Sequence, residues 1–209
     1  MVRVTGCGSA WLERCLREAE VASSNPATPI EEVRYLPDFF FHPKEKEIIM
    51  GKTLVAYFSV SGRTAEAARD LADAAGADIY RIEPEIPYVR ADLNWIDPDS
   101  RTTIEMHDRS KRPTIVNNDP HIAEYDQIFI CFPIWWYTVP TIINTFLESY
   151  DFSGKTILLF ATSGGSGLQK TLENVKDSVP ESAVIREGRM LNGRVPVSEL
   201  RAWLKERNL

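Results

Sequence analysis

Residues 57–64, YFSVSGRT, decide the fold because they link an apolar run to an alanine-rich run through a polar turn. The apolar run, residues 53–59, has the length and composition of a buried strand. The alanine-rich run, residues 64–75, repeats apolar side chains every three to four positions, and Gly76 follows it where a helix commonly ends. The stretch therefore predicts a strand that turns sharply into a helix, with hydroxyl-bearing residues in the turn.

The same alternation of strand-length and helical segments continues along the chain. Four more strands are predicted, at residues 78–82, 127–133, 156–161 and 183–185. Further helices are predicted at residues 139–150, 168–179 and 196–206. Residues 83–126 are rich in Pro, Asp, Asn and Arg, and there we expect one helix near residues 100–109 within a long loop. This pattern predicts an α/β fold with a doubly wound, five-stranded parallel sheet.

Composition limits the classes of protein to consider. The chain has 209 residues, of which 44% are apolar and 26% are charged, enough for one sizeable core. A net charge of -6 argues against a nucleic-acid surface. The longest apolar run, residues 127–139, is interrupted by Pro133 and is too short to cross a bilayer, so no membrane contact is expected. Three cysteines without a CxxC spacing indicate neither a disulfide framework nor a metal site, and we expect a cytoplasmic protein.

Residues 1–49 differ from the rest of the chain. They are rich in proline and contain no clear strand, and Met50 stands directly before the first strand. We interpret them as an N-terminal extension that is either disordered or non-native, the latter through a start codon assigned too far upstream. A genuine flexible extension, packed through Trp11, Leu12 and residues 37–41, is the alternative. The predicted folded domain spans residues 50–209.

The turn after the first strand has the composition of a phosphate-binding loop. Ser59, Ser61 and Thr64 offer hydroxyl groups, and Gly62 allows backbone amides to point into one concavity at the start of a helix. The turn lacks the lysine that a Walker loop uses to reach terminal phosphates, so nucleotide hydrolysis is not expected. Arg63 either adds positive charge or points to solvent. The alternative is a helix cap without a ligand, supplied by Ser61 or Thr64.

The turns after the third and fourth strands also have unusual compositions. Residues 132–140, FPIWWYTVP, place two tryptophans and a tyrosine where a loop is commonly polar. These aromatic residues either cover the edge of the core or form the wall of a pocket for a flat ligand. Residues 162–167, TSGGSG, contain glycines that allow close approach of the backbone to a ligand. Neither the GxSxG nor the GxGxxG pattern is met around them.

Three motifs together resemble the flavodoxin-like family: SxSGxT after the first strand, PIWW after the third, and FLESYDFSGKTILLFATSGGSG at residues 146–167. The resemblance implies the sheet order 2-1-3-4-5 and FMN as the cofactor. It places the FMN phosphate on Ser59, Ser61, Gly62, Arg63 and Thr64. It places the isoalloxazine ring between two loops, formed by Pro133, Ile134, Trp135, Trp136 and Tyr137 and by Thr162, Ser163, Gly164 and Gly165.

The resemblance implies a redox protein that transfers electrons through bound FMN. One hypothesis is an FMN-dependent oxidoreductase of the quinone reductase type, which uses NAD(P)H to reduce small acceptors, as a monomer or a homodimer. The alternative is a non-enzymatic flavodoxin that carries electrons between protein partners. A flavin-free scaffold that binds another phosphate is a third hypothesis. In all three cases no side chain is assigned as a catalytic acid, base or nucleophile, and Cys131 is expected to be a buried apolar residue.

Two features depart from the family pattern. Arg63 stands where relatives commonly have asparagine or glutamine, and residues 83–126 are longer than a small electron carrier requires. Within that region, residues 86–95, IPYVRADLNW, are predicted to form either a lid over the exposed edge of the ring or a loop packed on the surface.

Overall fold

The computed structural model describes residues 51–168 and 170–209, so the predicted extension, residues 1–49, lies outside the described residues. Within them the chain forms strands β1 (Thr53–Tyr57), β2 (Asp78–Arg81), β3 (Gln127–Pro133), β4 (Thr156–Thr162) and β5 (Val184–Met190). The α-helices are α2 (Arg63–Ala75), α3 (Arg101–His107), α4 (Thr141–Ser149), α5 (Thr171–Lys176) and α6 (Val197–Glu206). Two short 3-10 helices, η1 (Ala91–Leu93) and η2 (Ile122–Glu124), lie between β2 and β3.

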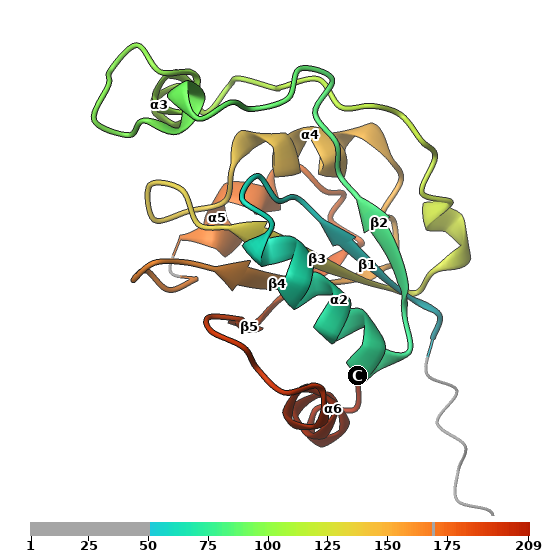
Figure 1. Ribbon diagram of the computed structural model, residues 1–209. Coiled ribbons are helices and arrows are strands. Elements are labelled where there is room, and N and C mark those ends of the chain that lie inside the picture. Colours follow the sequence, from blue (N-terminus) through green and yellow to red (C-terminus); the bar gives the residue numbers. More distant parts are fainter. Residues whose placement is uncertain (1–50, 169) are drawn as a thin grey trace, which may run out of the picture. The chain divides into compact units, whose positions relative to one another are not determined.

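The strands form one parallel sheet in the order β2-β1-β3-β4-β5 (Figure 1). This order confirms the predicted doubly wound sheet of five strands. The central strands β3 and β4 consist of almost uninterrupted apolar residues because helices cover both of their faces. The winding reverses between β1 and β3, which are neighbours in the sheet although β2 separates them along the chain. In such a sheet the carboxyl ends of the strands at this reversal form the usual ligand crevice.

Helices α2 and α6 cover one face of the sheet. The apolar stripe of α2, which includes Ala68 and Leu71, packs on that face together with Leu204 of α6. Phe129 of β3 and Phe160 of β4 fill the space between the sheet and these helices, and their ring centroids lie 5.2 Å apart. The three-to-four residue spacing of alanine in α2 brings the helix close to the strands, because alanine keeps only a methyl group between them.

Helices α4 and α5 cover the opposite face. Ile142, Ile143 and Phe146 of α4 and Val175 of α5 are all fully buried there. Residues 83–126, which we call the insertion, connect β2 to β3 and carry α3 past the end of α4 (Figure 1). The predicted helix at residues 100–109 is α3, and the hydroxyl of Ser100 accepts a hydrogen bond from the amide of Thr103 at its start.

Strand β5 is longer than the predicted strand at residues 183–185, which is a correction to the sequence analysis. Arg186, Glu187 and Arg189 interrupt the apolar pattern, but β5 is an edge strand, where charged side chains can face solvent. The pairing with β4 shifts between Leu159 and Ala161. At Gly188 a Cβ atom would lie 2.8 Å from the carbonyl oxygen of Leu159, so this irregular pairing requires glycine.

Candidate functional site

The first turn folds tightly at the start of α2. Gly62 is the N-cap residue of the helix and has a φ of 90°. Its amide donates a hydrogen bond of 3.1 Å to the hydroxyl oxygen of Ser59, and its carbonyl accepts one from the amide of Glu66. The side chains of Ser61 and Arg63 are exposed beside it. Because the N-cap is a glycine, neither Ser61 nor Thr64 caps the helix in the way that the ligand-free alternative requires.

Thr64 joins the first turn to the end of β4. Its side chain is 2% exposed, and its hydroxyl lies 2.8 Å from the hydroxyl of Thr162. The hydroxyl therefore ties two distant segments together and does not point freely toward a ligand. Among the described residues, no side-chain acceptor takes a hydrogen bond from the first amides of α2, so these amides are available to an anion.

The second turn is a strained two-residue hairpin, which we call the aromatic turn (residues 135–138). Trp135 and Thr138 exchange backbone hydrogen bonds of 3.0 and 2.9 Å. The two residues between them, Trp136 and Tyr137, have φ angles of 45° and 64°. Positive φ at both central positions is the geometry of a type I′ turn, which favours Asn and Gly. A bulky residue in this conformation costs about 1–3 kcal/mol, and such strain is common at ligand-binding sites.

The three aromatic residues of this turn have different surroundings. Trp135 packs edge-on against Phe58 and Tyr88, with ring centroids 5.5 and 5.4 Å away. Trp135 therefore covers the edge of the core, one of the two predicted alternatives. Tyr137, in contrast, is 65% exposed, and Trp136 is half-buried. The exposed side of the turn thus presents Trp136 and Tyr137.

The third turn follows β4 and is held by side chains. The hydroxyl oxygen of Ser163 accepts hydrogen bonds from the amides of Gly165 and Ser166, at 3.2 and 2.8 Å. The amide of Ser163 donates to the side-chain oxygen of Asn192, at 2.7 Å. Gly164 and Gly165 are exposed, and a Cβ atom on either would meet no other atom within 4 Å. The open space above their backbone leaves room for a ligand.

Hydrogen bonds bring the three turns together at one edge of the sheet. Thr162, at the end of β4, contacts the first turn through Thr64 and the second through Ile134, whose amide donates to the Thr162 carbonyl at 2.8 Å. The amide of Phe58 donates to the carbonyl of Cys131, which joins the ends of β1 and β3. The sequence motifs predicted this convergence only on the assumption of a doubly wound sheet, and the structure supplies the contacts.

A cavity of about 770 Å³ opens where the turns meet, within the size range of small-molecule sites. The predicted residues that line it are Ser61, Arg63, Thr64, Pro133, Ile134, Thr162, Ser163 and Gly164. The other predicted residues, Ser59, Gly62, Trp135, Trp136, Tyr137 and Gly165, lie in the same turns but not in its lining. The cavity extends from the ends of β3 and β4 along α2 toward the connection between β5 and α6.

Sequence reasoning missed the wall formed by α2 and by the β5–α6 connection. Glu66 and Asp70 lie on the cavity side of α2, and Asn192 and Arg194 follow β5. No motif marks these residues, but the position of the fifth strand was a usable signal. All strands of a parallel sheet end at the same edge, so the loop after β5 had to lie near the other three turns.

The charges around the cavity are mixed. Arg63 and Arg194 form no ion pair within residues 51–168 and 170–209, and neither do Glu66 and Asp70. Cys131 is fully buried in β3, as predicted, and burial raises the pKa of its thiol, so it remains protonated and unreactive. In the described part of the chain no cluster of His, Cys, Asp and Glu could hold a metal ion. The described helices are likewise too short or too polar to cross a membrane.

Comparisons with known proteins agree with this fold. The crystal structure of a putative flavoprotein from Bacteroides eggerthii is 43% identical, covers 76% of this chain and 99% of its own, and has a TM-score of 0.71. A second one, from Bacteroides uniformis, is 44% identical over 74% of this chain and 98% of its own, with a TM-score of 0.69. A flavoprotein from Lactobacillus acidophilus, solved in complex with FMN, is 20% identical over 73% of this chain and 98% of its own, and shares the fold at a TM-score of 0.53.

No curated protein matches the sequence. The family model described as flavodoxin matches residues 52–207, which include all five strands and all three turns. The match extends over the insertion as well, so the insertion is aligned within the family domain. This chain therefore belongs to the flavodoxin family.

Proposed function

We propose that this protein binds FMN at the three turns and transfers electrons through it, as an oxidoreductase that reduces small acceptors such as quinones with NAD(P)H. The observation that carries the proposal is one cavity lined by the first and third turns and by Pro133 and Ile134, which directly precede the second turn, with Thr64, Ile134 and Thr162 joined by hydrogen bonds. FMN supplies hydride and single-electron transfer, chemistry that protein side chains do not provide. The chain has to bind, orient and shield it.

The first turn fits a phosphate group. The first amides of α2 carry the partial positive charge of a helix N-terminus, and Ser59 and Ser61 add hydroxyl groups beside them. The cavity-lining guanidinium groups of Arg63 and Arg194 offset the negative charge of a phosphate without the lysine of a nucleotide hydrolase. This donor set is the reason for placing the FMN phosphate here.

The second and third turns fit a flat ring. Trp136 and Tyr137 offer aromatic surface on a rigid hairpin, and aromatic rings stack favourably on one another. The exposed backbone of Gly164 and Gly165 leaves open space on the other loop. A ring held between the two loops would be partly shielded from water, which favours transfer to a bound acceptor over side reactions.

An electron carrier between protein partners is the second candidate. Four apolar side chains of the insertion favour it, because they are unusually exposed: Ile86 at 68%, Val89 at 58%, Trp95 at 71% and Ile96 at 74%. All four lie within residues 86–96, and exposed apolar surface is typical of protein-contact sites. The same residues lie in or beside the segment predicted to be a lid or a surface loop, residues 86–95. In the structure this segment packs through Tyr88 and leaves Ile86, Val89 and Trp95 in solvent.

Two measurements on the purified protein separate these functions. First, FMN is added and binding is followed by the absorption spectrum and by quenching of flavin fluorescence; failure to bind FMN would leave only the scaffold hypothesis. Second, the FMN-loaded protein is mixed with NADPH and a quinone under anaerobic conditions. Repeated turnover by the protein alone supports the oxidoreductase, whereas turnover that requires a separate reductase supports the carrier.

The cytoplasmic location and the assembly state are part of the same proposal. Cys131, the one cysteine among the described residues, is a buried free thiol, as is usual in a reducing compartment. We propose a monomer or a homodimer, which sedimentation of the FMN-loaded protein distinguishes.

A further inference from the structure

The insertion contacts the aromatic turn on both of its flanks. On the first flank, Tyr88 packs against Trp135, with 5.4 Å between ring centroids, and against Phe58 at 5.6 Å. All three rings meet edge to face, the arrangement that aromatic pairs favour. The ring of Trp135 is therefore enclosed by residues that follow β1 on one side and belong to the insertion on the other.

Tyr88 is itself fixed by α3. Its hydroxyl donates a hydrogen bond of 2.8 Å to a carboxylate oxygen of Glu105, and the other carboxylate oxygen accepts one of 2.8 Å from Arg101. The Arg101 guanidinium also lies 3.9 Å from the centre of the Tyr88 ring. Burial, with the Glu105 hydrogen bond, raises the pKa of Tyr88, so its hydroxyl remains a donor. The ring that supports Trp135 thus has a single defined position.

On the second flank, Arg109 reaches from the end of α3 to the chain that leaves the turn. Its guanidinium donates to the backbone carbonyl of Val139 at 2.8 Å and to the side-chain oxygen of Asn144 at 3.2 Å. The Asn144 amide then donates to the carbonyl of Asn174, and the Asn174 side chain donates to the hydroxyl of Thr138 at 2.8 Å. The polar chain begins in the insertion and ends on the last residue of the aromatic turn.

The chemistry of Arg109 indicates a geometric role. The acceptors of its hydrogen bonds are all neutral, namely two oxygens and, at 3.7 Å, the sulfur of Met106, whereas Arg101 and Arg112 pair with carboxylates. Burial lowers the pKa of Arg109, and the nearby charge of Arg112 lowers it further. A planar guanidinium can hold two acceptors at fixed angles, which a lysine cannot. Its value at this position is therefore to fix the carbonyl of Val139 relative to α4.

We propose that Tyr88 and Arg109 are positioning residues that hold Trp136 and Tyr137 in their strained conformation, so that the insertion sets the geometry of the ring-binding loop. Aromatic residues with positive φ keep this backbone conformation only where the surrounding structure enforces it. The contacts of the insertion with both flanks of the aromatic turn supply that constraint from outside the turn. The consequence for FMN rests on the proposed function, whereas the constraint on the turn does not.

The test compares Arg109→Gln with a matched control, Arg189→Gln. Arg189 is also a largely covered arginine; it donates to Glu199 of α6 at 2.9 Å and lies 6.0 Å from the Trp203 ring, away from the insertion. Hydrogen exchange of the Trp135 and Thr138 amides is measured without cofactor, because both amides bond across the turn. We expect exchange to be about tenfold faster in Arg109→Gln and changed less than about twofold in Arg189→Gln.

A second arm measures the dissociation constant and the reduction potential of added FMN in the same variants. Arg109→Gln is expected to raise the FMN dissociation constant about tenfold and to shift the potential, while Arg189→Gln leaves both unchanged. Arg109→Lys, which keeps the charge but not the two fixed bonds, is expected to resemble Arg109→Gln. A wild-type protein that binds no FMN overturns the proposed function but leaves the exchange result to decide the role of the insertion.

A further variant, Tyr88→Leu, keeps the proposal testable if Arg109→Gln does not fold. Tyr88→Leu removes the ring that supports Trp135 and retains an apolar side chain of moderate size, so it is expected to speed exchange at the same two amides. Equal exchange at Trp135 and Thr138 in wild type, Arg109→Gln and Tyr88→Leu would overturn the proposal, whatever the protein does with FMN.

Discussion

Gly62 begins helix α2 with a φ of 90°, a conformation that any other L-residue adopts only with strain. Nothing lies within 4 Å of the position of a Cβ atom there, so the need for glycine comes from the backbone and not from crowding. In Gly62→Ala we expect a loss of about 1–2 kcal/mol in the free energy of unfolding. We also expect the FMN dissociation constant to rise at least about tenfold, because relief of the strain turns the first amides of α2 away from the phosphate.

Gly76 provides the control at the other end of the same helix. It also has positive φ, at 63°, and open space around its Cα, but it caps the C-terminus of α2, away from the cavity. Gly76→Ala is therefore expected to cost a similar free energy of unfolding and to leave FMN affinity unchanged. Urea denaturation and fluorescence titration measure the two quantities. Equal FMN affinity in Gly62→Ala and Gly76→Ala would show that the phosphate does not bind at the first turn.

Tyr137 combines positive φ with a largely exposed ring, so it contributes strain to the turn and little to the core. At most positions glycine is less stable than alanine, but at positive φ the order reverses. We expect Tyr137→Gly to be more stable than Tyr137→Ala by about 1 kcal/mol in urea denaturation. Both variants are expected to weaken FMN binding, because both remove the ring. A more stable alanine variant would show that the turn is not strained in solution.

Residue types in the three turns were sufficient to select these turns as a candidate site, because hydroxyls, glycines and exposed aromatics are unusual in ordinary connections. They were not sufficient to predict the role of each side chain. Thr64 bonds to Thr162 and Trp135 packs on Phe58, contacts that the sequence did not predict, while their contact with the cofactor stays a prediction. Such pairings depend on tertiary contacts between segments far apart in the sequence, and no local pattern records them.

Elements with a strong apolar period were predicted with their boundaries nearly correct. Strand β3 was predicted at its observed position, because burial on both faces leaves a continuous apolar signal. The helix predicted at residues 64–75 is α2, which begins one residue earlier, at Arg63. The edge strand β5 was predicted too short. Helix α5, Thr171–Lys176, was predicted too long, at residues 168–179. Elements at the periphery need less apolar surface, so their sequences carry weaker periodicity.

The insertion joins helix α4 through a charged pair that makes its attachment sensitive to pH. Arg112 donates to both carboxylate oxygens of Glu148, at 2.7 and 2.8 Å, and Ser178 donates as well. These bonds, that of Arg112 first, lower the pKa of Glu148 below its ordinary value of 4.5. A lowered folded-state pKa means that the pair stabilises the protein above about pH 4.5 and loses this contribution as the pH falls through the lowered pKa.

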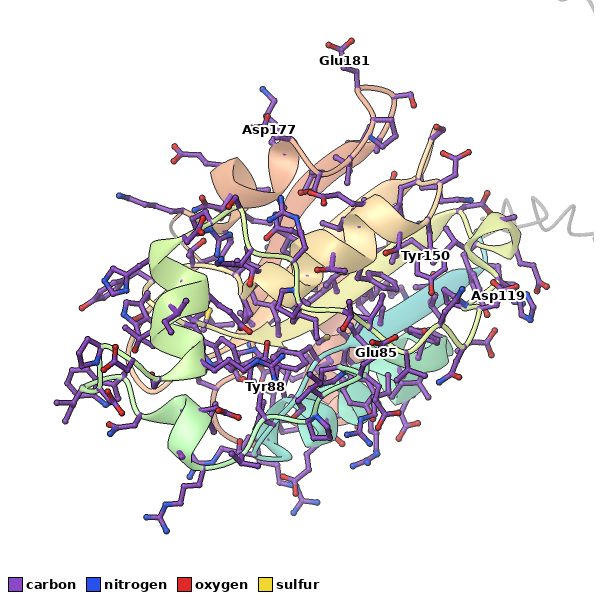
Figure 2. The ribbon with its side chains drawn as sticks, turned by 90° about the horizontal axis from the view of Figure 1, so that it is seen from above. Glu85, Tyr88, Asp119, Tyr150, Asp177 and Glu181 are labelled. Atoms are coloured by element: carbon purple, nitrogen blue, oxygen red, sulfur yellow. The ribbon has the colours of Figure 1, made fainter. Side chains whose placement is uncertain are left out.

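Glu148→Gln tests this attachment. The variant is expected to be less stable than wild type at pH 7, and the difference is expected to shrink as urea denaturation is repeated from pH 5 toward pH 3. Glu181→Gln is the control, since Glu181 projects into solvent from the loop before β5 (Figure 2). A difference between wild type and Glu148→Gln that stays constant with pH would show that the pair does not form.

For the whole molecule, one topological fact connects sequence to site. The reversal of winding between β1 and β3 brings the ends of β1, β3 and β4 together, and the three unusual turns follow those strands. The fold and the position of the candidate site therefore followed from the order of elements along the chain. The contribution of the insertion did not, because residues 83–126 have no repeating pattern and act through the contacts of single side chains such as Arg109.

The complete sheet, both buried faces and the cavity lie within residues 51–209, and the family match ends at residue 207. We therefore predict that a chain of residues 50–209 folds by itself, with the thermal midpoint and FMN affinity of the 209-residue chain. A single domain of this length buries enough apolar surface to be stable alone. The measurement is differential scanning calorimetry of both chains with and without FMN. A truncated chain that aggregates, or that melts at a clearly lower temperature, would show that residues 1–49 stabilise the domain.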